Sequence, residues 1–495
     1  MAIGQGLHVQ SETSPLLSQK LHQNQQTPQP YPPTPREASL YLSTGGVTFA
    51  SKEYKLLLKR SAPLIITFLL EYSFTAVSIF AVGHLGKIEL AATATACLTA
   101  NITGYAIYQG LATSLDTLCP SSYGAGRKEL VGLHCQRLAL FLWCITVPIA
   151  VMWTFAPCIL GLFMLQEVAD LAGLYVRILV LGAPGYAAFE VGKRFMLAQG
   201  LFSATLWVLC LCAPINALLN YLFVWVFKWG FIGAPVAVVI AQNLMPLTLV
   251  IYVRFIAGYD CWKSFTRSAL QDWWPIVRLA LPGVVMVEAE MLAWELMTLV
   301  TSLISVDHLA AQSTISTMSS IAFNCHFPIS IAAATRVSTL IGAGYSDAAK
   351  MAAKAAIGTS FAFGFMVAVF LTALRNQLPL LVTGNPEVVR LISSTLLMVE
   401  VSQLFDSLAT SLNGILRGLG KQKIGGATAV FCYYVVGVPV SLALVFKVHW
   451  NLIGLAVGTA IALVLIALIE GVFVATRNWE KISQEAILRY AASDY

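Results

Sequence analysis

The sequence has little charge for its size. Of its 495 residues only 11% are Asp, Glu, Lys or Arg, whereas a soluble protein typically has about 25%. The hydrophobic share is 58%. This composition excludes an ordinary soluble enzyme and a nucleic-acid-binding domain, because the net charge of +6 comes from basic residues scattered between apolar runs. The chain is predicted to be a polytopic helical membrane protein.

The sequence also lacks the residue patterns of metal and catalytic sites. Its ten cysteines include no CxxC pair, and the closest two, Cys210 and Cys212, lie in an apolar run. No Ser/His/Asp or Cys/His set is placed to support catalysis, and no phosphate-binding Gly-Lys-Ser/Thr follows the glycines at 342–344. We therefore expect no enzyme activity, no metal and no cofactor.

The first 50 residues contain no apolar segment that could serve as a cleavable signal peptide. They are rich in Gln, Pro, Ser and Thr, and such a segment cannot bury enough apolar surface to fold. We expect residues 1–50 to be a disordered cytosolic tail. Within it, Glu12, Leu16 and Leu17 have the spacing of an acidic dileucine signal for a sorting adaptor. Such a signal favours the vacuolar over the plasma membrane; a chance match is the alternative.

Twelve apolar segments, each long enough to cross a bilayer, lie between residues 62 and 474. Basic residues concentrate in the intervals after the even-numbered segments. The positive-inside rule therefore places both termini in the cytosol. The basic residues assigned to these loops include Lys193, Arg194, Arg336 and Arg417.

The two halves of the chain repeat each other. Gly-Ala-Gly occurs at 124–126 and 342–344, and Trp-x-x-Ile-Gly occurs at 229–233 and 450–454. Because six is an even number of helices, both halves start on the same side, so the repeats are parallel. The predicted fold is an all-α polytopic membrane protein with twelve transmembrane helices in two parallel six-helix repeats. The predicted parts are the tail (1–50), an N-terminal lobe (51–253), a cytosolic linker (254–278), a C-terminal lobe (279–475) and a cytosolic C-terminal tail (476–495).

The apolar segment 281–300 carries three acids, Glu288, Glu290 and Glu295. A single carboxylate at the centre of a span costs roughly 2.5–3.5 kcal/mol on insertion scales, so we expect these acids to face a protein-lined cavity. Glu288 and Glu295 are seven residues apart and share a helix face, whereas Glu290 lies about 140° from Glu295. The three side chains cannot all point at one spot on a straight helix.

The repeat relates other intramembrane acids to these. Glu71 corresponds to Glu290, and Glu190 corresponds to Asp406, which lies near Glu400. Burial and a neighbouring carboxylate both raise the pKa of a carboxyl group, so such an acid can carry a proton near neutral pH or, when ionised, hold a cation. The alternative for any one of them is a neutral acid whose hydrogen bonds tie helices together.

Aromatic and amide side chains accompany the acids. Trp294 lies beside Glu295, Tyr433 and Tyr434 lie on the eleventh predicted helix, and Asn101 lies on the second. Aromatic faces beside carboxylates suit organic cations through cation–π and apolar contact. Packing against lipid or other helices is the alternative for each aromatic residue.

Several long motifs resemble the multidrug and toxic compound extrusion (MATE) transporters, in particular their eukaryotic, fungal-like branch. The resemblance covers essentially residues 55–475. It implies a twelve-helix, two-lobe antiporter that exports organic cations or other metabolites against an inward flow of protons or Na⁺. The motifs are VGHLGKIELAA (82–92), GLATSLDTLCPSSYGAGR (110–127), AATRVSTLIGAG (333–344), GILRGLGKQKIGGA (414–427) and CYYVVGVPVSLAL (432–444).

The resemblance also implies roles for particular residues. The family's seventh-helix motif, two Glu separated by four residues, matches Glu290 and Glu295, although Met291 stands where Trp is usual. The tenth-helix acid matches Asp406, and the second-helix Asn matches Asn101. Together with the residues above, the expected proton- or substrate-binding set is Glu290, Glu295, Asp406, Glu71, Glu190, Asn101, Trp294 and Tyr434.

The function expected from the sequence is a proton-coupled antiporter for small organic, cationic substrates in the vacuolar or plasma membrane. Na⁺ is the less expected coupling ion. The first alternative is a flippase for lipid-linked substrates, which would need buried Lys or Arg for polyanionic head groups. It is disfavoured by helices that carry acids and are fairly poor in cations. The second, an intramembrane enzyme, lacks a nucleophile or metal constellation.

Overall fold

The structure is a computed structural model that describes residues 50–381 and 385–491. Within these residues every regular element is helical. The expected disordered tail, apart from Ala50, lies outside the described residues. The sorting motif at Glu12, Leu16 and Leu17 lies there too, and both remain predictions.

The N-terminal half forms a bundle of six passes, which we call the N-lobe. Its second and fifth passes each contain a π-helical segment, η1 and η2, and such segments frequently occur at functional sites. The elements are α3 (Ala50–Gly83), α4 (Lys87–Ala100), η1 (Asn101–Tyr105), α5 (Ala106–Gly124), α6 (Lys128–Thr154), α7 (Ala156–Leu160), α8 (Gln166–Leu179), α9 (Ala183–Ala198), α10 (Ala204–Tyr221), η2 (Leu222–Val226), η3 (Gly230–Ile232) and α11 (Gly233–Phe255).

Two short 3₁₀ turns, η4 (Tyr259–Cys261) and η5 (Arg267–Leu270), connect this bundle to the second one, the C-lobe. The C-lobe also has six passes, and its fifth contains the π-helical segment η7. Its elements are α12 (Trp274–Ser302), α13 (Val306–Gly342), α14 (Ser346–Ala373), η6 (Pro379–Leu381), α15 (Pro386–Gly418), α16 (Gln422–Val430), η7 (Phe431–Gly437), α17 (Val438–Phe446), α18 (Asn451–Thr476) and α19 (Trp479–Ala491).

The predicted twelve passes agree with the helices of the structure. Among the described residues, nine helical segments are long and apolar enough to span a membrane, and α8 with α9, bent by 55°, make a tenth. The other two passes are α12, which carries three glutamates, and α13, which is rich in Ser and Thr. The last helix, α19, is not a pass; it packs on α13 and α14, where Ser483 donates a hydrogen bond to the Ile341 carbonyl at 3.0 Å.

The repeated Gly-Ala-Gly tripeptides end corresponding helices in the two lobes. Gly126 has a φ of 78° and Gly344 a φ of 84°, a left-handed conformation that glycine adopts without steric cost. Each glycine follows the end of a helix, α5 or α13, and reverses the chain. The sequence repeat is therefore also a repeat of backbone conformation.

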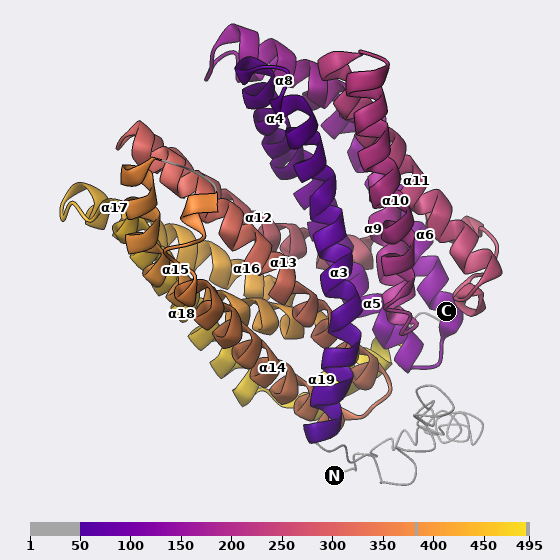
Figure 1. The fold of residues 1–495 in the computed structure, drawn as a ribbon. Coiled ribbons are helices and arrows are strands. Elements are labelled where there is room, and N and C mark those ends of the chain that lie inside the picture. Colours follow the sequence, from indigo (N-terminus) through magenta and orange to yellow (C-terminus); the bar gives the residue numbers. More distant parts are fainter. Residues whose placement is uncertain (1–49, 382–384, 492–495) are drawn as a thin grey trace, which may run out of the picture.

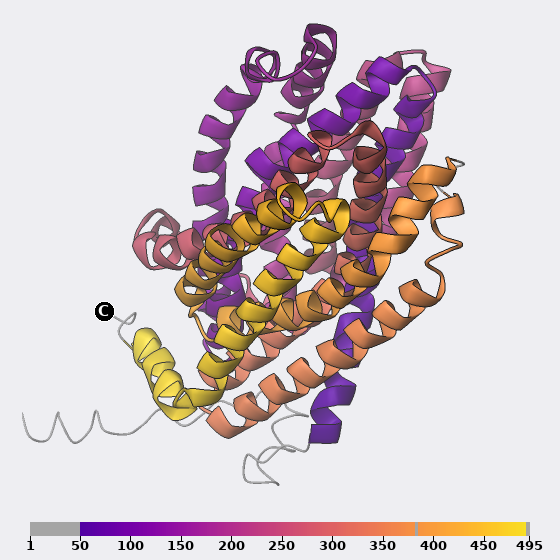
Figure 2. The ribbon, with the colours of Figure 1, turned by 90° about the vertical axis from the view of Figure 1, so that its left-hand side faces the viewer.

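The two lobes lean together at one end of the molecule and diverge at the other (Figure 1). They meet at the end where α3 begins and α19 lies, and the turned view in Figure 2 also places α19 at this end. The contact is close because it is made by glycines of α5 and α13. A Cβ on Gly124 would lie 2.0 Å from the carbonyl oxygen of Thr339, and a Cβ on Gly342 would lie 2.1 Å from the carbonyl oxygen of Ser121.

The substitution Gly342→Ala tests this contact. The added methyl group would collide with backbone rather than with a flexible side chain, so we expect the free energy of unfolding to fall by about 1–3 kcal/mol. The matched control is Gly471→Ala on α18, where the nearest atom to a new Cβ is 3.9 Å away. Thermal melting of the purified protein should show a loss for the first variant and none for the second; equal melting would contradict the close contact.

Candidate functional site

The N-lobe acids lie in a buried chain of ion pairs. Lys193 donates to both carboxylate oxygens of Glu71, at 3.0 and 3.2 Å, and its Nζ lies 2.6 Å from Glu190 Oε1. Arg194 is also paired with Glu190, whose side chain has no exposed surface. The placement of Lys193 and Arg194 in a loop was therefore wrong: both are buried in α9. A hydropathy pattern ends a span at two adjacent charges, but here Glu71 and Glu190 neutralise them.

This chain of charges continues from one lobe to the other. Arg194 Nε lies 3.6 Å from Asp116 Oδ1 on α5, and the other oxygen of Asp116 lies 3.9 Å from Arg417 on α15. Arg417, also expected in a loop, is 2% exposed and donates a hydrogen bond to Ser330 at 2.9 Å. Its guanidinium lies 5.3 Å from the centre of the Phe327 ring, a cation–π contact. Asp116 thus joins the cations of both lobes.

Hydrogen bonds close the same end of the molecule. Thr117 Oγ1 donates to the Arg417 carbonyl at 2.5 Å, and Ser338 Oγ donates to the Thr117 carbonyl at 2.7 Å. Gln422 Nε2 donates a further hydrogen bond to Thr117 Oγ1 at 2.8 Å. Each bond joins α5 of the N-lobe to a helix of the C-lobe.

A second ion pair between the lobes lies nearby. Arg336 of α13, the remaining cation expected in a loop, is buried and pairs with Glu53 of α3 at 2.8 Å. Helix α3 therefore packs against both lobes at this end, and its Leu57 and Leu64 belong to the apolar cluster of α13 and α14.

The C-lobe contains an acid cluster, which we define as Glu290, Asp406 and Glu470. Glu290 lies on α12, close enough to Asp406 and Arg417 to interact with their charges. Glu470 on α18 likewise interacts with Glu290 and Arg417. Asp406 Oδ2 lies 3.3 Å from His326 Nε2 on α13, and Thr410 donates to the other oxygen of Asp406 at 3.4 Å.

Two members of this region, Glu470 and His326, were missed in the sequence. Glu470 is an acid within an apolar 26-residue helix, the same signal that singled out the other intramembrane acids. His326 lies in the middle of α13 and only its contact with Asp406 marks it. Glu470 could therefore have been found from the sequence, whereas His326 could not.

The two lobes differ in how their acids are compensated. In the repeat, Glu190 corresponds to Asp406, but the positions that match Lys193 and Arg194 are Ala409 and Thr410. The three N-lobe acids Glu71, Glu190 and Asp116 therefore lie beside Lys193, Arg194 and the shared Arg417. Within the described part of the chain, the cationic or ionisable basic groups beside the acid cluster of the C-lobe are Arg417 and His326. Among the described residues, the surplus of negative charge lies in the C-lobe.

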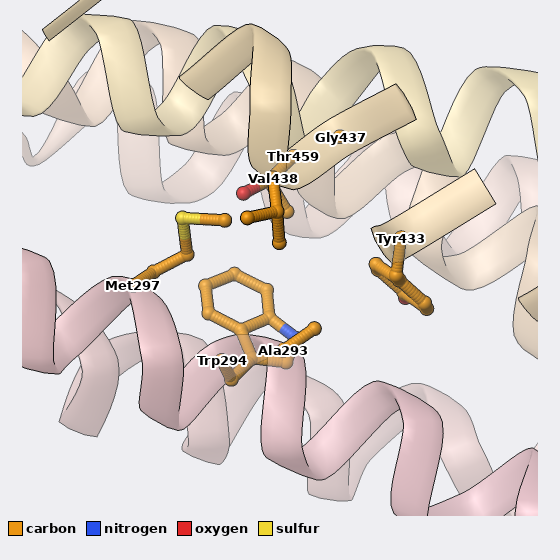
Figure 3. A pocket seen from close by; sticks show the side chains of 7 residues that line it. All are labelled: Ala293, Trp294, Met297, Tyr433, Gly437, Val438 and Thr459. Atoms are coloured by element: carbon orange, nitrogen blue, oxygen red, sulfur yellow. The ribbon is translucent and has the colours of Figure 1, made fainter. Parts of the chain in front are cut away.

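An aromatic pocket adjoins the acid cluster. It has a cavity volume of about 10 Å³, room for about one water molecule, and is lined by α12, η7, α17 and α18. Figure 3 shows Trp294 and Met297 of α12 projecting toward Val438 and Thr459. Tyr433 lines this pocket and also interacts with the charges of the acid cluster, so the pocket lies next to the acid cluster. The lining residues are Ala293, Trp294, Met297, Tyr433, Gly437, Val438 and Thr459.

The other expected site residues lie around this centre. Tyr434 does not line the pocket; its hydroxyl donates to the Ala289 carbonyl at 3.1 Å and ties η7 to α12. The structure brings Glu290, rather than Glu295, next to Asp406; Glu295 lies five residues further along α12. Asn101, at the start of η1, contacts Met291 Sδ of α12 at 3.7 Å and so bridges the lobes.

The MatE family model matches residues 63–222 and 282–443, one copy in each half of the chain. Two similar fungal proteins are uncharacterised transporters. One, YDR338C of Saccharomyces cerevisiae, is 42% identical over 92% of this chain and 66% of its own length. The other, C4B3.13 of Schizosaccharomyces pombe, is 40% identical over 88% of this chain and 81% of its own length.

An animal multidrug and toxin extrusion protein and a solved structure are similar as well. Human multidrug and toxin extrusion protein 1 is 30% identical over 88% of this chain and 77% of its own length. The crystal structure of the eukaryotic MATE transporter AtDTX14 superposes with a TM-score of 0.85 at 27% identity, covering 89% of this chain and 99% of that one. The family model and these relatives place the chain among membrane transporters. The chain belongs to the MatE family of multidrug and toxin extrusion transporters, as its motifs predicted.

The substitution Asp116→Asn tests the charge contact between the lobes. It leaves Arg194 and Arg417 buried with one acid fewer, and breaking a buried pair in this way typically costs about 3–5 kcal/mol. We expect a large fall in melting temperature. Glu387→Gln is the control, because it breaks the exposed pair with Arg390 and should cost no more than about 1 kcal/mol. Similar losses in the two variants would show that Asp116 does not hold the lobes together.

Proposed function

We propose that the protein is a proton-coupled antiporter that exports organic cations, as xenobiotics or metabolites, from the cytosol by alternating access. The observation that carries the proposal is the surplus of negative charge in the acid cluster. Glu290 and Glu470 face the guanidinium of Arg417, which also faces Asp116, and Asp406 lies beside His326. Carboxylates in a low-dielectric site are strongly stabilised by a proton or a cation.

The adjoining pocket supports an organic cation as the substrate. Trp294 and Tyr433 provide aromatic surface, while Met297 and Val438 provide apolar surface next to the acids. The pocket has a volume of about 10 Å³ in this state, so it must open before an organic cation can place its apolar body against these side chains and its charge near Glu290. Cation–π contact and charge pairing then act on the same ligand.

Proton and substrate compete for the same negative charge. When the acid cluster binds protons it loses its attraction for a cation, and by linkage a bound cation lowers the affinity for protons by the same factor. Protonation from the acidic side of the membrane therefore releases substrate there, and deprotonation on the cytosolic side restores the site. Glu290 and Asp406 are the residues proposed to exchange proton for substrate; Na⁺ is the alternative coupling ion.

The closed end of the molecule is proposed to face the cytosol. Lys128, Lys350 and Lys421 lie at the helix ends around the contact between the lobes, and the positive-inside rule assigns such residues to the cytosolic side. The structure then corresponds to a state closed to the cytosol, with both termini cytosolic. The vacuolar and the plasma membrane are both proposed locations.

The rival function, a flippase for lipid-linked substrates, requires cations for polyanionic head groups. The expectation that the helices are poor in such cations was incorrect, because Lys193, Arg194, Arg336 and Arg417 are buried. Each of them, however, is paired with an acid. The charge that is left over is negative, which favours a cationic rather than an anionic substrate.

Transport by the purified protein in proteoliposomes tests the proposed function. Uptake of a panel of organic cations, ethidium and tetraethylammonium among them, should follow an imposed pH gradient and stop when the gradient is collapsed. An imposed Na⁺ gradient without a pH difference should not drive it. Uptake driven by a Na⁺ gradient alone would show that Na⁺, and not the proton, is the coupling ion. If no cation of the panel is taken up under either gradient, the proposal is rejected.

The substitution Glu290→Gln tests the proposed exchange residue. It removes the charge of the half-buried member of the acid cluster, and loss of one charged contact is worth about 1.5–3 kcal/mol, or roughly ten- to hundredfold in proton-driven uptake. The control is Glu288→Gln, two residues away on α12, whose carboxylate neighbours Tyr434 instead of Asp406. Uptake at the wild-type rate by Glu290→Gln would remove this residue from the mechanism.

A further inference from the structure

Glu470 is the most enclosed acid of the C-lobe. It lies near the end of α18, in the run ALVLIALIEGVFVAT, and its side chain has no exposed surface. Neither of its carboxylate oxygens has a hydrogen-bond partner among the described residues. A buried carboxylate without partners is costly, so a structural role as a hydrogen-bonded tie between helices does not explain it.

The groups around Glu470 come from three elements. Glu290 faces it from α12 and Arg417 from α15, while Cys432 and Tyr433 of η7 interact with its charge. Arg417 is the cation among these groups. Its Nε has no hydrogen-bond partner among the described residues, and its nearest contact with an acid is 3.9 Å, to Asp116.

We propose that Glu470 is a further proton-binding residue of the transport site, beside Glu290 and Asp406, and that Glu470 and Glu290 share the positive charge of Arg417. The proposal rests on the proposed proton-coupled antiport. One guanidinium that already faces Asp116 cannot neutralise two further carboxylates in a low-dielectric core. At least one of the two carboxyl groups therefore holds a proton, and it gives up that proton when a cation supplies the missing charge.

The proton step needs no other reactant. Each carboxylate forms one O–H bond when it takes up a proton and breaks the same bond when the proton leaves. Because Glu470 has no exposed surface, its proton passes through the acid cluster, where Glu290 is the half-buried member. A cation bound beside Glu290 then displaces protons from both residues, so two protons are exchanged per monovalent or divalent substrate when both acids ionise.

The experiment is an infrared pH titration of the full-length protein in liposomes, which follows the carbonyl band of protonated carboxyl groups and needs no substrate. The carbonyl band that is present in the wild type and absent from Glu290→Gln belongs to Glu290, and its pH dependence gives the protonation transition of this residue. In Glu470→Gln we expect the loss of about one titrating proton per protein. We also expect the Glu290 transition to move to more acidic pH by about one unit, because Arg417 then acts on Glu290 without its competitor.

Two further variants keep the result interpretable. Glu400→Gln removes another buried acid, on α15, and should lose its own band while leaving the Glu290 transition in place. Glu470→Asp keeps the acid and should retain two coupled transitions, even if Glu470→Gln fails to fold. The inference is overturned if the Glu290 transition is the same in Glu470→Gln and the wild type, or if the Glu470 carboxyl keeps its proton over the whole titration.

Transport separates this inference from the proposed function. If the wild type shows no proton-driven exchange of any cation, the proposed function fails whatever the titration shows. If the wild type exchanges protons for ethidium, we expect Glu470→Gln to transport with about one proton fewer per substrate. An unchanged proton-to-substrate ratio would overturn the role of Glu470 alone.

Discussion

The buried charge of Arg417 is the constraint on which the contact between the lobes depends. It faces Asp116 of the N-lobe on one side and the acid cluster of the C-lobe on the other. In a low-dielectric interior a charge needs a partner, and a competing partner weakens the pair it already makes. The glycine contacts of α5 and α13 and the hydrogen bonds of Thr117 bring these helices near enough for that pair to form.

The two lobes share a backbone plan and differ in electrostatics. Duplication placed an acid on the fourth helix of each half, Glu190 and Asp406. Only the first of them is followed at i+3 and i+4 by basic residues, Lys193 and Arg194. The N-lobe thus holds a compensated ionic network that suits rigidity, and the C-lobe holds an uncompensated one that suits ligand exchange. Pseudo-symmetry of the fold does not extend to the chemistry.

The sequence predicted the number of passes, the duplication and the family, because each depends on long patterns of apolar residues and motifs. It also singled out Glu290 and Asp406, which the structure brings together. The positions of Lys193, Arg194, Arg336 and Arg417 could not be predicted, since their burial depends on acids that lie far away in the chain or on other helices. That Tyr433 rather than Tyr434 lines the pocket could not be predicted for a related reason: which of two adjacent aromatic side chains faces the pocket depends on the π-helical turn of η7.

By itself, then, the sequence determined that this chain spans the membrane as two parallel six-helix repeats and carries acids within the spans. Hydrophobicity and helical periodicity act over neighbouring residues, so they can be read along the chain. Only the tertiary structure decided which acids are neutralised and which are not, because a charge pair depends on distance in space and on the water excluded around it. Of the acids in the segment 281–300, Glu290 lies near Asp406 and Glu288 lies beside Tyr434. The structure also brings Glu470 to Glu290, from a helix that begins about 150 residues further along the chain.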